Sequence, residues 1–141
     1  MNGTDIISAL LKEEGRQNIQ GMAEFLSENV VYEMPYALHG TPEVIKGRDS
    51  LIGLLQQFIG KETGLYAEWS IHDVKIYPSG EPDLLFAEMM AKGIVSGSGY
   101  AYKQSYISLF RLHEDRVTMW REYFNPIPLQ EALQTISSSD S

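Results

Sequence analysis

Glu122 is the residue whose type and position point most directly to chemistry. Strand alternation over residues 117–124 places it on one face together with Trp120 and Phe124. If that face lines the interior, desolvation raises the carboxyl pKa toward the range in which one group both donates and accepts a proton near neutrality. If the face points outward, Glu122 is a solvated surface charge, as most strand carboxylates are. The spacing alone leaves both interpretations open.

The neighbouring segment, residues 100–112, has the composition of a pocket wall. Alternation places these side chains on one face: Tyr102, Gln104, Tyr106, Ser108 and Phe110. Aromatic walls with a few donors and acceptors are typical of small-molecule pockets. A half-exposed, tyrosine-rich sheet or a dimer surface has the same composition, so the pattern does not choose between them.

Other catalytic and metal-binding patterns are absent from the sequence. The chain has no cysteine, which excludes disulfides, thiolate nucleophiles and Cys-containing zinc sites. His39, His72 and His113 share no ligand spacing, and neither a phosphate-binding glycine motif nor HExxH nor GxSxG occurs. We therefore expect no metal site, and the role of the histidines stays open.

Length and charge narrow the class of protein. The chain has 141 residues and a formal net charge of −8, which predicts one globular domain and argues against a nucleic-acid partner. No apolar run approaches the roughly 20 residues of a membrane span. The first five residues lack the basic region of a signal peptide, and we expect a cytoplasmic protein.

Helical spacing belongs to the first half of the chain. Apolar residues from Ile6 to Leu11 predict one helix that ends at Gly15, and Asn18 caps a second whose apolar face extends to Leu26. A short strand follows over residues 30–34, then a loop over 36–46. A third helix begins at about Asp49 and ends at Gly60.

The second half predicts a meander of long strands. These cover residues 66–77, 84–95, 100–112 and 117–124, with turn residues between them, and a terminal helix covers 129–136. Hairpin spacing makes the strands antiparallel neighbours. The expected fold is α+β: a cone-shaped, curved antiparallel sheet with three N-terminal helices in its concave face, as in cystatin-like α+β barrels. Residues 1–136 form the domain, and 137–141 form a disordered tail.

The chain resembles the phenazine-biosynthesis A/B-like branch of the SnoaL-like proteins, within the superfamily of ketosteroid isomerase and nuclear transport factor two. The resemblance covers roughly residues 5–135. Its motifs are Val44-Ile45-Lys46-Gly47-Arg48-Asp49 and Trp120-Arg121-Glu122-Tyr123-Phe124-Asn125-Pro126. It implies a cofactor-free pocket for a small, often cyclic, organic molecule and a homodimer formed through the sheet. The family's acid/base glutamate falls on Glu122 and its pocket tyrosine on Tyr102.

The departures from these relatives are as informative as the matches. A histidine and a serine on the third helix of the phenazine proteins align with Leu54 and Phe58, which makes the pocket more apolar and argues against phenazine formation itself. The ketosteroid isomerase base aligns with Met34, its oxyanion-hole acid with Ser108, and its tyrosine with the region of Leu10. Steroid isomerisation by that machinery is therefore not expected.

Three functional hypotheses follow. The first is a small isomerase, cyclase or condensation enzyme of secondary metabolism that uses Glu122 as acid/base. Tyr102 and Gln104 would orient its substrate, and five apolar or aromatic side chains would exclude water: Trp120, Tyr106, Phe124, Leu54 and Phe58. The second is a non-catalytic ligand-binding module with the same cone. The third is a dimeric interaction module that uses an outer strip of residues: Ile107, Leu109, Val117, Met119 and Tyr123.

Overall fold

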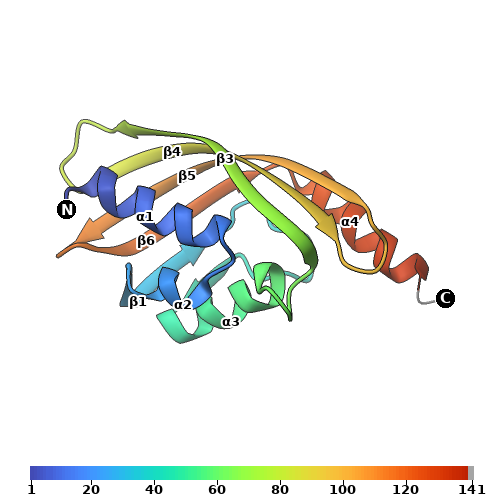
Figure 1. The fold of residues 1–141 in the computed structure, drawn as a ribbon. Helices are drawn as coiled ribbons and strands as arrows, with labels where there is room; N and C mark the ends of the chain where they lie inside the picture. The colour runs from blue at the N-terminus through green and yellow to red at the C-terminus, as the bar shows by residue number, and fades with distance from the viewer. Residues whose placement is uncertain (140–141) are drawn as a thin grey trace.

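Six strands form one curved, unclosed sheet that holds the N-terminal helices against its concave face in the computed structural model (Figure 1). The structure describes residues 1–139, with side chains as far as residue 136. The strands are β1 (Leu26–Glu33), β2 (Val44–Lys46), β3 (Tyr66–Pro78), β4 (Leu84–Val95), β5 (Ala101–His113) and β6 (Arg116–Phe124). The helices are α1 (Gly3–Gly15), α2 (Ile19–Ala23), α3 (Arg48–Ile59) and α4 (Pro126–Ser139). The predicted α+β cone is confirmed.

The sheet has the order β2-β1-β6-β5-β4-β3. Strands β3 to β6 form the predicted antiparallel meander. β1 joins this meander by pairing in parallel with β6, so that Tyr32 lies opposite Trp120. A hairpin turn cannot make a parallel pair, and the connection from β1 to β6 instead runs through β2, α3 and the other three strands of the meander.

Local sequence features mark the starts of the first three helices. Asn2 and Asp5 form a reciprocal capping box at the start of α1, and the Asn18 side chain caps α2 as expected. Gly47 precedes α3 with a φ of 96°, and its N–H donates to the Val30 carbonyl at 2.8 Å. A side chain at that φ would be strained, which explains why glycine stands there.

Three predicted boundaries are wrong. Leu26 begins β1 rather than extending the apolar face of α2, because the backbone there pairs with β6: the Val117 N–H donates to the Phe25 carbonyl at 2.8 Å. The segment predicted as a loop, 36–46, contains β2, which is too short to show alternation. α4 begins at Pro126 instead of residue 129, since proline suits a first helical turn and Asn125 accepts from the Ile127 N–H at 3.1 Å. Of the predicted disordered tail, 137–141, residues 137–139 belong to α4, and residues 140 and 141 lie outside the described residues.

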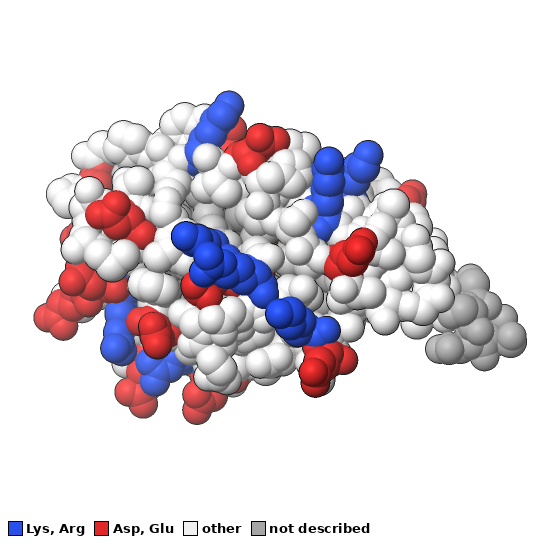
Figure 2. Space-filling model, viewed as in Figure 1, with Lys and Arg blue, Asp and Glu red and all other residues white. Residues whose placement is uncertain are grey.

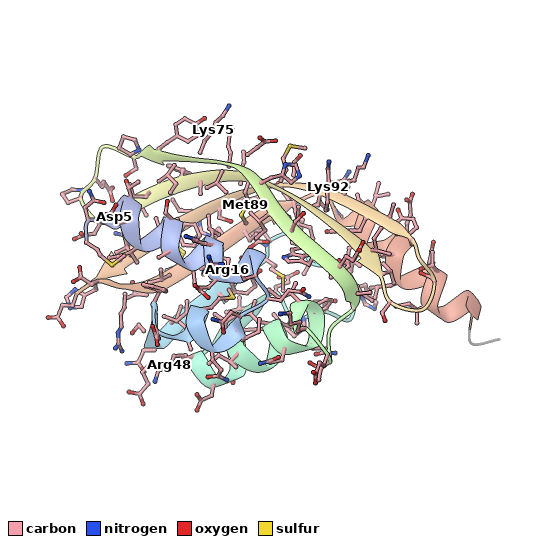
Figure 3. All side chains as sticks on the ribbon, in the orientation of Figure 1. Asp5, Arg16, Arg48, Lys75, Met89 and Lys92 are labelled. Carbon is pink, nitrogen blue, oxygen red and sulfur yellow. The ribbon has the colours of Figure 1, made fainter. Side chains whose placement is uncertain are left out.

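The two faces of the sheet differ in chemistry. Lys75 on β3 and Lys92 on β4 point away from the helices, whereas Met89 is buried beneath the strands (Figure 3). Acidic and basic side chains are interspersed over the one face of the molecule that Figure 2 shows. Val117, predicted on the outer strip, is 0% exposed because a register shift at Arg111/Leu112 turns the start of β6 inward. Along the described residues, no helix combines the length and apolar character that a membrane crossing requires.

Candidate functional site

Glu122 lies inside the cone, so the inward-facing interpretation of β6 is the correct one. Its side chain is 6% exposed, and one carboxylate oxygen, Oε2, accepts a hydrogen bond from the Tyr32 hydroxyl at 3.2 Å. Burial raises the pKa of Glu122 from 4.5 to about 7, and the Tyr32 hydrogen bond acts in the opposite direction. A carboxyl with this pKa exists in both protonation states near neutral pH, as a general acid or base requires.

A second buried carboxyl, Glu14, lies near Glu122. It belongs to the last turn of α1 and is 6% exposed, and its Oε2 atom has no hydrogen-bond partner among the described residues. Burial raises the pKa of Glu14 well above its ordinary value, and the charge of Glu122 raises it further. The sequence interpretation placed one carboxyl in the pocket, Glu122, and the structure adds a second one, Glu14.

The two carboxyls line an interior cavity of about 80 Å³. Its wall combines α1, α3 and strands β1, β3, β5 and β6 with the loop after β1 and the start of α4. The lining residues are Glu14, Tyr32, Met34, Ala37, Leu38, Thr41, Leu54, Leu55, Phe58, Ile59, Tyr66, Trp69, Tyr102, Tyr106, Glu122, Phe124 and Leu129. Typical drug-sized pockets measure about 300–1,000 Å³. The cavity as it stands therefore suits a compact molecule.

Two tyrosines on β5 place hydroxyl groups at the wall of this cavity. The Tyr102 and Tyr106 hydroxyls are hydrogen-bonded to each other at 3.0 Å. The Gln104 amide donates to the Tyr102 hydroxyl at 3.3 Å and to the Asn125 carbonyl at 2.6 Å. Burial raises the pKa of both tyrosines, most strongly that of Tyr106. Their phenols thus stay protonated, and because one of the two donates to the other, a single O–H of the pair is left to donate to a ligand.

Six of the nine predicted site residues line the cavity, and three lie behind its wall. The six are Glu122, Tyr102, Tyr106, Phe124, Leu54 and Phe58. Of the others, Gln104 supports Tyr102 through the hydrogen bond described above. Trp120 is fully buried, with its ring 5.1 Å from that of Tyr32, and Ser108 is fully buried with an Oγ that has no hydrogen-bond partner among the described residues. Alternation placed all three on the correct face but did not show how deep each lies.

Sequence reasoning missed Glu14, Tyr32 and a group of aromatic residues on β3. Glu14 is seven residues after Ile7 and four after Leu10, which puts it on the buried face of α1 and is a signal that could have revealed it. Tyr32 alternates with buried Val30 in β1. Tyr66 and Trp69 stack near Tyr102, with ring centroids 4.7 Å apart from each other, and only the β3–β4–β5 register brings them there.

The histidines lie apart from this site. His39 and His113 are exposed, and the Nδ1 atom of His72 lies 3.0 Å from the Asp73 carboxylate. Among the described residues, no group of three or more histidine, aspartate or glutamate side chains is arranged to hold a metal ion.

Comparison with known proteins relates this chain to a family. The model of the SnoaL-like domain family matches residues 7–120. This chain belongs to the SnoaL-like family. The SnoaL-like chain is 30% identical over 116 residues to the uncharacterized protein YesE of Bacillus subtilis (strain 168), which covers 82% of this chain and 76% of YesE. It is 26% identical over 139 residues to an uncharacterized PhzA/B-like protein of Pseudomonas aeruginosa, covering 99% and 95% of the two chains.

The fold of this SnoaL-like chain also recurs in crystal structures. A Bacillus subtilis protein described as a candidate isomerase superposes with a TM-score of 0.81 and 24% identity, over 94% of this chain and 92% of its own. An identity this low establishes the fold only. The resemblance to phenazine-biosynthesis-like proteins that the sequence indicates is thereby confirmed at the level of family and fold.

Proposed function

We propose that this SnoaL-like protein is a cofactor-free isomerase, cyclase or condensation enzyme that acts on a small organic molecule and uses Glu122 as its acid/base group. The observation that carries the proposal is the position of the Glu122 carboxyl, buried at the wall of an interior cavity with a pKa raised to about 7. Structural ion-pair networks also perturb carboxyl pKa values, but no cation accompanies Glu122 among the described lining residues.

The chemistry is a proton shift. The ionised Glu122 carboxylate removes a proton from an acidic carbon of the substrate, and the resulting carboxylic acid returns that proton to another carbon or oxygen of the same molecule. The electron pair left on the carbon moves into a new double bond or attacks an internal carbonyl, so the step needs no external oxidant or reductant. The same carboxyl ends the cycle in the protonation state in which it began.

Three kinds of neighbour support this role. The Tyr32 hydroxyl orients the carboxyl by donating to its Oε2 atom. The hydrogen-bonded pair of Tyr102 and Tyr106 hydroxyls has one O–H beyond the bond between them, and this O–H would stabilise negative charge developing on a substrate oxygen. Phe124, Leu54 and Phe58 are apolar wall residues that would exclude water. The PhzA/B-like name of the Pseudomonas aeruginosa relative supports a place in secondary metabolism, and the absence of cysteine supports a cytoplasmic location.

The direct test replaces Glu122 with glutamine, which retains the size and much of the hydrogen bonding of glutamate. A thermal-shift screen of small cyclic ketones, polyketide fragments and amines would identify ligands, and product formation from each would then be followed by mass spectrometry. We expect turnover to fall by about 10²–10⁴ in E122Q, because a general acid/base contributes that much. The exposed Glu28 on β1 offers a matched control, since E28Q removes a carboxyl far from the cavity. Turnover that is unchanged in E122Q removes the residue from the mechanism.

The second candidate is a binding module without chemistry, favoured by the small volume of the cavity. It predicts that ligands stabilise the wild type and E122Q and that neither protein forms a product. A substrate turned over by the wild type alone rejects this candidate.

A homodimer formed through the sheet is part of either proposal. The outer face carries a hollow of about 750 Å³ whose lining includes Tyr36, Met90 and Tyr123, and Ile107 beside them is 49% exposed. Apolar side chains gathered on an outer sheet face are typical of a protein interface. The hollow shares Tyr106 and Phe124 with the interior cavity, so a partner seated there would contact the outer side of the cavity wall.

A further inference from the structure

The described lining of the cavity contains acidic side chains but no basic ones. Glu14 and Glu122 both line it, whereas no lysine, arginine or histidine occurs among its described lining residues. The lining tyrosines cannot compensate, because their phenols are neutral when protonated. A ligand that enters this space meets two carboxyls and no cation.

The proposed acid/base mechanism assigns no role to Glu14. The helix α1 holds its carboxyl in the cavity wall, and the Oε2 atom lacks a hydrogen-bond donor anywhere in the described part of the chain. A buried carboxyl oxygen without a partner destabilises the fold, because it has lost water and gained nothing in exchange. Retaining such a group in the wall is explained if a ligand supplies the missing donor.

Aromatic rings make up seven of the other fifteen lining residues. Three of them form a cluster on β3 and β5: the ring centroids of Tyr66 and Tyr102 are 5.1 Å apart, and those of Trp69 and Tyr102 are 6.2 Å apart. Tyr106 and Phe124 continue this wall with their centroids 5.7 Å apart. The faces of aromatic rings attract cations, and Trp and Tyr do so most strongly.

We propose that the cavity binds a compact organic cation that carries a protonated amine, with Glu14 as its counter-ion and hydrogen-bond acceptor. This inference rests on the proposed function and assigns the substrate class of the same site. Glu122 remains the acid/base group, and the Glu14 carboxylate accepts from the ammonium while the aromatic walls contact the hydrocarbon part. Binding of a carboxylate ligand is not expected, since the described lining offers it no cation.

A matched set of ligands on one five-membered ring tests the charge preference by itself. The probes are cyclopentylamine, cyclopentanol and cyclopentanecarboxylate, titrated into the full-length protein by calorimetry at pH 7.5. We expect the amine to bind at least about tenfold more tightly than the alcohol, and the carboxylate not to bind. Equal binding of amine and alcohol, preferred binding of the carboxylate, or no binding of the amine at millimolar concentration each overturns the proposal.

Two variants on α1 then assign the effect to Glu14. E14Q should weaken amine binding about tenfold and leave the affinity for the alcohol unchanged within about twofold. E13Q removes the adjacent carboxyl, which faces Arg16 and Asn18 at the surface, and should bind both probes like the wild type. Amine binding that E14Q retains in full rejects Glu14 as the counter-ion. If E14Q does not fold, the wild-type ligand series still decides the proposal.

The readout also separates this inference from the proposed function. Calorimetry measures binding without turnover, so a preference for the amine can hold even if E122Q turns over every substrate as well as the wild type. Conversely, a loss of turnover in E122Q with no preference among the three probes retains the acid/base role and rejects the cationic ligand.

Discussion

Replacing Glu122 with glutamine is expected to stabilise the protein at alkaline pH and to change little at acidic pH. Burial raises the pKa of this carboxyl to about 7 in the folded protein, whereas it titrates near 4.5 in the unfolded chain. Between these values the folded state binds the additional proton, so the wild-type stability falls as pH rises. The 2.5 pH units between 4.5 and 7, at about 1.36 kcal/mol each, correspond to about 3 kcal/mol. Glutamine does not titrate, and E122Q should not show this loss.

The measurement is the free energy of unfolding in urea, followed by tryptophan fluorescence at several pH values from 4.5 to 8.5. Relative to E122Q, the free energy of unfolding of the wild type should be highest below about pH 4.5. Above about pH 7 it should be lower by about 3 kcal/mol. Glu14 on α1, Tyr32 on β1, and Tyr102 and Tyr106 on β5 face the same carboxyl. Because burial and the charge of Glu122 raise the pKa of Glu14, the double variant E14Q/E122Q should flatten the curve further.

The control is E28Q, whose stability curve should run parallel to that of the wild type because Glu28 is exposed. A stability difference between the wild type and E122Q that is the same at pH 4.5 and pH 8 would refute the reasoning. It would mean that the carboxyl of Glu122 is as well solvated in the folded protein as in the unfolded chain.

Further expectations concern three other positions. Y32F removes the hydroxyl that donates to Glu122, so the pKa of that carboxyl should rise further, which NMR of ¹³C-labelled glutamate would detect as a titration midpoint at higher pH. G47A should lose about 1–3 kcal/mol of stability in urea unfolding, because alanine at a φ of 96° is strained; an unchanged stability would show that the backbone relaxes there. I107E places a charge on the outer face and should shift sedimentation toward the monomer, whereas a wild type that is already monomeric at micromolar concentration would reject the proposed interface.

Local patterns predicted most of the elements. The meander from β3 to β6 follows from turn residues between alternating segments, and the start of α2 follows from Asn18. The predictions that were wrong concern a very short element and a pairing between distant segments. β2 has only three residues, and it lies in a segment predicted as a loop. Leu26 was expected in a helix and lies in a strand, because β1 pairs with β6 there. Neither a three-residue strand nor a partner some 90 residues away leaves a periodic signal in the sequence.

The candidate site likewise combines features that follow from local sequence with features that depend on tertiary packing. Alternation along β6 determined from sequence alone that Trp120, Glu122 and Phe124 share a face, because the strand period of two is a local property of the backbone. Which face becomes the interior was decided by the helices that cover it. Glu14 shares a cavity with Glu122 across 108 positions of sequence because α1 packs inside the curved sheet. Burial, and therefore the proton affinity of both carboxyls, depends on that long-range packing and on no residue pattern within a few positions of either.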